Sequence, residues 1–334
     1  MRMQSPADEI SSPLLSALSL ELPPLVCIVG PTATGKTALA VRLSEAVGGE
    51  IVSADSRQVY RGMDIGTAKA TPEEQTRAVH HLIDIVEPDE TLGLAQFQEL
   101  AYAAIADITS RRQVPFLVGG TGQYVMAVIE GWKVPRVPPD EALRGKLYRQ
   151  AEEEGAEALH ARLQELDPVA ADRIDVRNVR RVVRALEVCL ITGRPISEQQ
   201  AKSPPPYRIL MLGLRLSRQH LYQRIDRRVE TMIAAGLEDE VRRLVRAGYG
   251  FELPAMSGVG YGQFAPYLAG EANSAKEVTL DLVIREIKRA TRRFVRHQSN
   301  WFRRGDAHIH WLDAGNDPYD IFYSGKSCGR IGRT

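Results

Sequence analysis

Gly30-Pro-Thr-Ala-Thr-Gly-Lys-Thr37 is the stretch that decides the fold of this 334-residue chain. It fits the pattern G-x-x-x-x-G-K-[ST], in which a glycine-rich turn curls its backbone N–H groups around a phosphate. The pattern has this meaning only between a strand and a helix, and the sequence indicates both. Residues 25–29 form a continuous apolar run, and residues 36–47 have helical periodicity. The sequence therefore predicts a phosphate-binding loop after the first strand of an α/β sheet.

The residue types of this loop each help to bind an anion. The helix that begins after the loop directs its partial positive charge at the phosphate. Lys36 adds a mobile cation, and the hydroxyl of Thr37 is placed to ligate Mg²⁺. The residues predicted to surround the phosphate are Gly30, Thr32, Ala33, Thr34, Gly35, Lys36 and Thr37.

Strands and helices alternate after this loop. Residues 50–54 and 115–118 have the apolar, branched composition of buried strands, and residues 95–112 have a helical period. This alternation predicts an α/β fold with a doubly wound parallel sheet, like that of the P-loop NTPases.

Two proline-rich stretches, residues 134–139 and 203–206, divide the chain. Between them the pattern is almost entirely helical, and a strand pattern returns at residues 209–214. The simplest architecture is a helical insertion in a P-loop core. The predicted parts are a flexible extension (1–24), the first part of the core (25–136), the insertion (137–205), the second part of the core with basic helices (206–312), and a tail (313–334).

Charge limits the kind of nucleic-acid surface that this chain can have. The net charge is +1, so a basic surface must come from local clustering. Residues 207–304 hold 18 Lys and Arg against 10 Asp and Glu, which places that clustering in the C-terminal third.

Cysteine usage and hydropathy indicate the compartment. Cys27, Cys189 and Cys328 are far apart and odd in number, which argues against a disulfide framework or a zinc module and favours a reducing environment. No apolar run reaches the roughly 18 residues of a membrane span. The weak apolar patch near the start of the chain is interrupted by polar residues, and the single basic residue Arg2 does not make the basic start of a signal peptide. We therefore expect a cytoplasmic protein without membrane contact.

Two polar residues follow predicted strands, at the edge where doubly wound sheets bind ligands. Asp55 offers a carboxylate that can accept a proton or a hydrogen bond, although the same residue type also caps turns. Thr121 lies among three glycines that permit close approach of a ligand or else form a tight turn. A nucleotide hydrolase would require an acid at the end of a buried strand to hold Mg²⁺. The strand before Thr121 does not end in an acid. The loop can therefore hold a diphosphate for some other chemistry.

A basic helix is predicted around residues 283–304. Lys288, Arg292 and Arg296 recur at every fourth position and share one face, which suits a phosphate backbone. His297, Trp301 and Phe302 lie among the charges and can stack on bases. The alternative is an ordinary solvated helix face with local ion pairs.

Further motifs follow the phosphate loop in a fixed order. They are Ser53-Ala-Asp-Ser56, Tyr60-Arg-Gly-Met-Asp-Ile-Gly-Thr-Ala-Lys69, His80-His-Leu-Ile-Asp84, Leu117-Val-Gly-Gly-Thr-Gly122, Arg184-Ala-Leu-Glu187, Val259-Gly-Tyr261 and Arg296-His-Gln298 with Trp301. The phosphate loop alone is generic, whereas this ordered series is highly specific. From about residue 25 to residue 304 the chain resembles the tRNA dimethylallyltransferases, also called tRNA isopentenyltransferases.

The resemblance implies a reaction: transfer of a dimethylallyl group from dimethylallyl diphosphate to N6 of an adenine at tRNA position 37, beside the anticodon. It places the catalytic carboxylate on Asp55, the pocket threonine on Thr121 and the diphosphate loop on residues 32–37, and Mg²⁺ is expected to assist there. A monomer is implied. The implied contacts with the anticodon stem-loop are Asp55, Ser56, Arg57, Gln58, Thr121, Arg144, Arg180, Arg181, Arg184, Gly260, Tyr261, Arg292, Arg296, His297, Gln298, Trp301 and Arg303.

Three positions depart from the family pattern. Gly262 stands where a basic residue is common, Gln96 replaces a frequent acid, and His297 stands where arginine is common. These departures concern individual RNA contacts rather than the reaction. Two alternatives remain open at this level: an adenylate isopentenyltransferase that acts on free nucleotide, and an RNA-linked P-loop NTPase or kinase that binds ATP.

Overall fold

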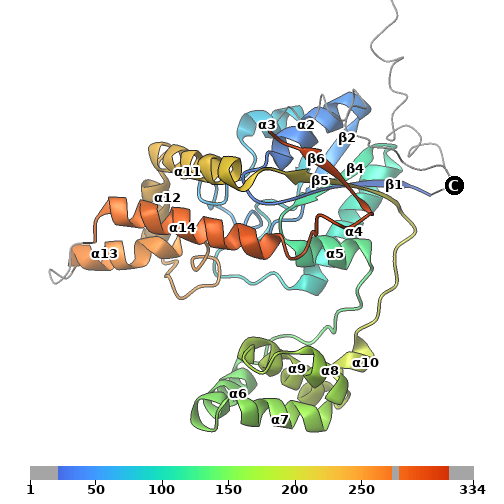
Figure 1. Ribbon diagram of the computed structural model, residues 1–334, viewed down its shortest axis with the longest axis vertical. Helices are drawn as coiled ribbons and strands as arrows, with labels where there is room; N and C mark the ends of the chain where they lie inside the picture. The colour runs from blue at the N-terminus through green and yellow to red at the C-terminus, as the bar shows by residue number, and fades with distance from the viewer. Residues whose placement is uncertain (1–21, 273–277, 316–334) are drawn as a thin grey trace, which may run out of the picture. The chain divides into compact units, whose positions relative to one another are not determined.

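The computed structural model describes residues 22–272 and 278–315 (Figure 1). The chain divides into two compact units, which we call the core unit (Met1–Met126 with Pro206–Thr334) and the helical unit (Ala127–Pro205). The expected boundary at residue 137 lies inside the helical unit. The reason is that the two connecting segments pair with each other: Lys133 N–H donates to Ala201 O at 2.8 Å, and Ser203 N–H donates to Gly131 O at 2.9 Å.

A six-stranded sheet forms the centre of the core unit. Its strands are β1 (Pro24–Val29), β2 (Gly49–Ser53), β3 (His80–His81), β4 (Val114–Gly119), β5 (Arg208–Arg215) and β6 (Ile309–Asp313). They lie in the order β3-β2-β4-β1-β5-β6, and every pairing between neighbours is parallel. The prediction of a parallel, doubly wound α/β sheet is therefore confirmed.

The outermost strand β6 was not predicted. It lies at the edge of the sheet, where only Ile309 and Leu312 of its five residues are buried. An edge strand that is half exposed lacks the continuous apolar run by which the sequence marks β1 and β4.

Helices from the first half of the chain flank the sheet (Figure 1). They are α2 (Lys36–Val47), α3 (Pro72–Arg77), α4 (Leu94–Ser110) and α5 (Gly122–Ile129). Leu39 and Leu43 of α2 pack on Ile28 and Phe116 of the strands, and burying such a side chain contributes roughly 1.5–3 kcal/mol. Cys27 points the other way along β1 and is fully buried, which raises the pKa of its thiol to about 12. Cys27 is therefore a plain core residue.

The second half of the core unit is mainly helical, as predicted. It contains α11 (Arg218–Ala234), α12 (Leu237–Arg246), the short 3₁₀ helix η2 (Gly262–Phe264), α13 (Ala265–Ala272) and α14 (Leu280–Gln298). The basic helix ends at Gln298 instead of residue 304, and the chain then turns so that Phe302 is only 4% exposed. Phe302 is therefore a core residue and is not free to stack on a base. None of the helices in the described ranges is both long and apolar enough to cross a membrane.

The helical unit has its own hydrophobic centre. Its helices are α6 (Glu141–Glu153), α7 (Ala156–Leu166), α8 (Pro168–Arg173), α9 (Val179–Thr192) and α10 (Ile196–Gln199). Leu147, Leu163 and Leu186 are almost completely buried where α6, α7 and α9 meet. Since these side chains form one cluster, the unit has a core independent of the sheet.

One carboxylate is buried in this unit. Glu187 of α9 is fully buried and accepts hydrogen bonds from Arg144 Nε at 2.8 Å, from Arg184 Nη1 at 2.5 Å and from Asp140 N–H at 2.8 Å. Burial opposes its ionisation, but these hydrogen bonds outweigh burial and keep the pKa of Glu187 below its usual value. Arg144 and Arg184, two of the residues that the resemblance assigned to tRNA, thus hold the helical unit together.

We expect Glu187→Ala to destabilise the helical unit by about 3 kcal/mol, because it leaves two guanidinium groups facing an uncompensated cavity. Hydrogen exchange measured by mass spectrometry should show faster exchange of the α6 and α9 amides and unchanged exchange in β4. Glu141→Ala is the matched control, since Glu141 is an exposed partner of Arg144 and its loss should change little. Unchanged protection of α9 in the Glu187 variant would contradict this structural role.

Candidate active site

The phosphate loop, Asp55 and Thr121 meet at one edge of the sheet. They follow β1, β2 and β4, and β4 lies between the other two strands. Thr121 N–H donates to Ala54 O at 3.3 Å, and Thr121 Oγ1 accepts from Ser56 N–H at 3.0 Å. Thr121 therefore holds the backbone on both sides of Asp55, so the two residues that the sequence predicted to act together do lie together.

The ends of β2 and β4 approach each other very closely. A Cβ atom at Gly119 would lie 2.1 Å from Ala54 O, which no side chain tolerates. Glycine at this position thus permits the contact that places Thr121 beside Asp55. Of the glycines around Thr121, Gly119 is therefore required by the close packing of β2 and β4.

Asp55 caps a turn, which is one of the two roles that the sequence left open. Its Oδ1 accepts Arg57 N–H at 2.9 Å, which is the turn-capping bond typical of aspartate. Its negative charge also raises the pKa of Lys36 and of Arg228 against the effect of burial. The half-buried carboxylate therefore caps a turn and also lies in the field of two cations.

The phosphate loop is tightly curled before α2 begins at Lys36. Ala33 has φ +68°, a left-handed conformation that is uncommon for a residue with a side chain. Thr34 is 1% exposed and its hydroxyl donates to Pro31 O at 2.8 Å, which closes the turn on itself. Lys36 Nζ donates to Pro31 O at 3.0 Å. Burial lowers the pKa of Lys36 to about 8, Asp55 opposes this shift, and Arg228 adds to it.

Two arginines of α11 reach this site, and sequence reasoning missed both. Arg224 Nη1 donates to Thr34 O at 3.4 Å, and half-buried Arg228 donates to Thr67 O at 3.5 Å. Burial lowers the pKa of Arg228, and attraction to Asp55 opposes this. Their four-residue spacing places them on one helix face. No recognisable motif surrounds them, so only the fold shows that they face the loop.

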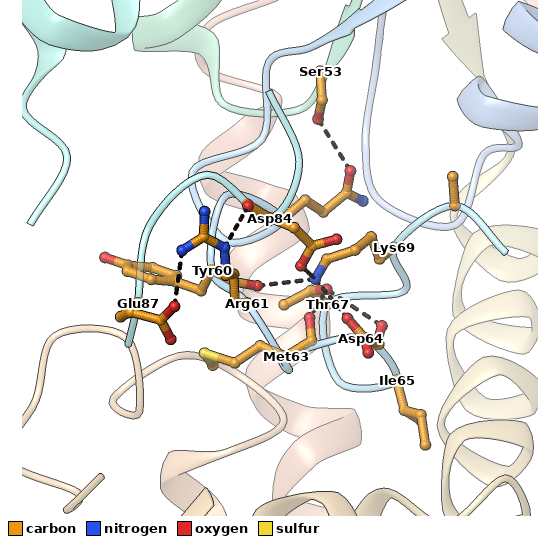
Figure 2. A network of polar contacts seen from close by, with 12 residues as sticks. Ser53, Tyr60, Arg61, Met63, Asp64, Ile65, Thr67, Lys69, Asp84 and Glu87 are labelled. Atoms are coloured by element: carbon orange, nitrogen blue, oxygen red, sulfur yellow. Dashed lines mark hydrogen bonds and ion pairs between the residues drawn. The ribbon is translucent and has the colours of Figure 1, made fainter. Parts of the chain in front are cut away.

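The loop of residues 60–69 is held by a buried lysine (Figure 2). Lys69 Nζ donates to Tyr60 O at 2.9 Å and to Asp64 Oδ1 at 2.5 Å, and it also pairs with Asp84. At the nearby strand end, Ser53 Oγ donates to Gln58 Oε1 at 3.0 Å (Figure 2). This loop, which carries the longest motif of the resemblance, is thus fixed by internal charges.

A second buried charge fixes the same loop from α12. Glu240 is 1% exposed and accepts the N–H groups of Asp64, Ile65 and Gly66 at 2.9–3.0 Å. It also accepts the hydroxyl of Tyr261 at 2.7 Å, and burial together with Glu240 raises the pKa of Tyr261. Tyr261, which the resemblance assigned to tRNA, is itself 1% exposed. This assignment is corrected, because the ring lies in the core and its hydroxyl has an internal partner.

The basic face of α14 is partly neutralised by α11. Lys288 Nζ lies 2.7 Å from Glu230 Oε1, and Arg292 Nη2 lies 2.6 Å from Asp226 Oδ1. Only Arg296 of the three predicted phosphate contacts is exposed without a described acid partner. The acids belong to another helix, so the sequence of α14 by itself does not reveal them.

The end of α14 lies against the turn that carries Thr121. Gln298 is 4% exposed and bonds to the backbone of Thr32 and Gly120, so it is an internal residue and not the RNA contact that the resemblance suggested. A Cβ atom at Gly122 would lie 2.1 Å from the Trp301 ring, whose residue remains 39% exposed. Trp301 therefore packs on this turn with part of its surface and offers the remainder to solvent.

The remaining predicted RNA contacts are placed as follows. Arg57 donates to Pro254 O at 2.5 Å, and Gln58 Nε2 donates to Ala68 O at 3.2 Å, so both have internal partners. Gly260 is buried. The exposed residues are Arg296, His297 and Arg303 in the core unit and Arg180 and Arg181 in the helical unit.

A parallel sheet with this loop, cations and strand-end carboxylate defines an enzyme of the P-loop NTPase-like fold. A family model described as "IPP transferase" matches residues 58–305. The chain is 58% identical over 281 residues to a protein named tRNA dimethylallyltransferase from Roseiflexus sp. (strain RS-1), covering 84% of this chain and 90% of that protein. It is 55% identical over 280 residues to one from Chloroflexus aggregans, covering 84% and 93%. The chain therefore belongs to the IPP transferase family.

Solved structures agree. The full-length tRNA isopentenylpyrophosphate transferase from Bacillus halodurans is 41% identical, with a TM-score of 0.64, and the match covers 91% of this chain and 95% of that one. A eukaryotic dimethylallyltransferase described as acting on tRNA is 25% identical, with a TM-score of 0.74 and coverage of 91% and 77%. Both relatives are named as transferases, and the enzyme class predicted from the sequence is confirmed.

The lowered pKa of Lys36 makes anion binding sensitive to pH. Burial lowers the pKa of the Lys36 ammonium from its usual 10.5 to about 8. We therefore expect the affinity for inorganic diphosphate, measured by calorimetry without metal, to fall above pH 8 by up to about tenfold per pH unit. Diphosphate itself gains negative charge over this range, which would strengthen binding. A decrease in affinity can therefore be assigned to the loss of the proton from Lys36.

Lys36→Arg is the control for this titration, because its guanidinium keeps its charge throughout the range. Its affinity should not decrease with rising pH. A wild-type profile that follows that of Lys36→Arg between pH 7 and pH 10 would show that Lys36 does not carry the interaction.

Proposed function

We propose that this protein transfers a dimethylallyl group from dimethylallyl diphosphate to N6 of an adenine beside the anticodon, at position 37 of tRNA, and releases diphosphate. The observation that carries the proposal is the junction of the three strand ends. It brings a carboxylate, Asp55, and a phosphate loop with Lys36 together at one edge of the sheet. Membership in the IPP transferase family and the names of the relatives support the same reaction.

The acceptor side of the reaction requires a base. The lone pair of an adenine amine is delocalised into the ring, so the amine is a weak nucleophile. As N6 forms a bond to C1 of the dimethylallyl group, the C1–O bond to diphosphate breaks and its electron pair leaves with the oxygen. The proton of N6 passes to Asp55, whose backbone Thr121 holds in place. The oriented carboxylate is thus the general base.

The donor side requires stabilisation of negative charge on the departing diphosphate. Lys36, the loop amides and the start of α2 supply fixed positive charge there, and Arg228 adds a second cation close by. Because these groups are held before substrate binds, they need not reorganise as the charge develops. Arg228 joins the diphosphate-binding set that the sequence predicted at residues 30–37.

Mg²⁺ fits this site as a partner of the donor. In the described residues no three His, Cys, Asp or Glu side chains gather as a metal site. The chain therefore offers an oxygen such as the Thr37 hydroxyl and leaves the other ligands to phosphate oxygens and water, an arrangement that Mg²⁺ commonly adopts. When bound, the ion would neutralise part of the diphosphate charge.

The RNA is proposed to meet the exposed cations of each unit. In the helical unit, Arg180 and Arg181 lie in the first turn of α9, which contains no acid. Cations at this end oppose the helix dipole, and a phosphate would relieve that repulsion. In the core unit, Arg296, His297 and Arg303 are exposed beside the partly exposed Trp301. We propose that the protein acts as a monomer in the cytoplasm.

A transfer assay tests the reaction. With labelled dimethylallyl diphosphate and Mg²⁺, we expect label in an anticodon stem-loop RNA, because the exposed arginines favour a polyanionic acceptor. The label should be lost when the target adenine is replaced. Label in AMP alone would instead indicate an enzyme acting on free nucleotide. Absence of transfer together with RNA-stimulated ATP turnover would indicate a P-loop NTPase or kinase.

Substitution of Asp55 tests the base. Asp55→Ala should reduce kcat by about 10²–10⁴-fold, the range typical of a lost general base, while donor binding is largely kept. Asp55→Asn separates the two roles of this side chain, because an amide oxygen can still accept Arg57 N–H but cannot take a proton. We expect Asn to be as inactive as Ala.

Two outcomes would contradict the base assignment. An active Asn variant would leave Asp55 with its turn-capping role alone, and an equal loss of donor binding would favour a metal-ligand role. Asp89→Ala, which removes an exposed acid of the same unit, is the control and should retain activity.

A further inference from the structure

Gln298 is an amide side chain enclosed between the two loops of the proposed site. It is the last residue of α14 and is 4% exposed. Its Oε1 accepts the N–H of Thr32 in the phosphate loop at 2.8 Å, and its Nε2 donates to Gly120 O, next to Thr121, at 3.2 Å. One side chain thus bonds to the donor loop with one end and to the catalytic turn with the other.

The fit of this amide is close on the side of the turn. A Cβ atom at Gly120 would lie 2.3 Å from Gln298 Nε2, so the amide rests directly on the backbone there. Glycine at residue 120 leaves the space that the side chain of Gln298 fills. A longer or shorter side chain would lose one of the two bonds.

The contact also bears on the strained part of the phosphate loop. Ala33 is left-handed, and such conformations persist only where the surroundings hold them. Gln298 holds the residue before Ala33, while the Thr34 hydroxyl and Arg224 hold the residue after it. Without Gln298, one of these supports is lost, and the Thr32 N–H is left without its partner.

Gln298 is buried, whereas the residues that precede it in the sequence are exposed. Arg296 and His297 are exposed, as an RNA contact must be, whereas the amide of Gln298 is directed inward and both of its ends are bonded to protein. The amide is enclosed between two backbone segments, so neither of its ends is open to a base. The position of Gln298 therefore indicates a role at the donor loop and not in RNA binding.

We propose that Gln298 is a positioning residue that holds the diphosphate loop in register with the Thr121–Asp55 turn. The inference rests on the proposed function, because it assumes that the loop binds the donor diphosphate. Gln298 prepares the loop for the anion before RNA arrives. Its loss therefore weakens donor binding in the absence of RNA, which loss of an RNA contact does not do.

Calorimetry with inorganic diphosphate and no RNA tests this role. Gln298→Met preserves length but removes both hydrogen bonds, and we expect the Kd for diphosphate to rise about tenfold. Gln298→Glu keeps an acceptor for Thr32 N–H but sets an oxygen against Gly120 O, so it should show a similar or larger rise. In steady-state assays the KM for dimethylallyl diphosphate should rise while the KM for RNA is unchanged.

Gly120→Ala approaches the same contact from the other side. Its Cβ displaces the amide, so it should reproduce the weaker diphosphate binding, and the double variant Gly120→Ala/Gln298→Met should be no worse than the single ones. Arg296→Ala is the matched control on the exposed face of the same helix end. It should raise the KM for RNA and leave the diphosphate Kd unchanged.

The outcomes distinguish this inference from the function on which it rests. Wild-type protein that binds no diphosphate overturns the proposed function and this role with it. Wild-type protein that binds diphosphate, with folded Gln298 variants that bind it equally well, overturns the positioning role alone. If Gln298→Met does not fold, Gln298→Glu and Gly120→Ala decide by the same measurement.

Discussion

The close contact between the ends of β2 and β4 is the constraint on which the site depends. Thr121 N–H donates to Ala54 O, and the side chain of Thr121 accepts the N–H of Ser56. This approach is possible because residue 119 has no side chain. The carboxylate of Asp55 is thereby held between two fixed backbone groups, at the edge where the phosphate loop also ends.

Charge at this edge is arranged around one anion and several cations. Asp55 lies in the field of Lys36 and Arg228, and burial makes each cation costly in the absence of a phosphate. A diphosphate would supply the missing negative charge. Two buried carboxylates elsewhere are structural. Glu240 fixes the loop of residues 60–69, and Glu187 stabilises the helical unit. The chain thus uses these two buried acids as structural centres, whereas the half-buried Asp55 lies at the end of a strand beside two cations.

Much of the core was predictable because its signals are local. The run at residues 25–29 and the helix after Lys36 appear as β1 and α2, since a buried parallel strand and a helix each impose a period on their own residues. Strand β6 escaped prediction because an edge strand is half exposed and shows no such run. Arg228 escaped because a cation on a helix face carries no motif. Its position near Asp55 follows from how α11 packs on the sheet.

The sequence by itself determined the phosphate loop, the alternation of four of the six strands with helices, and the family, because an ordered series of local motifs encodes them. It did not determine which polar residues face inward. Tyr261, Gln298, Arg144 and Arg184 belong to motifs that suggested RNA contact, yet each bonds to buried protein groups. Those partners are distant in the chain, and Thr32 and Gln298 are 266 positions apart. Only the tertiary structure decided these roles, because a polar group is buried where long-range packing supplies its hydrogen-bond partner.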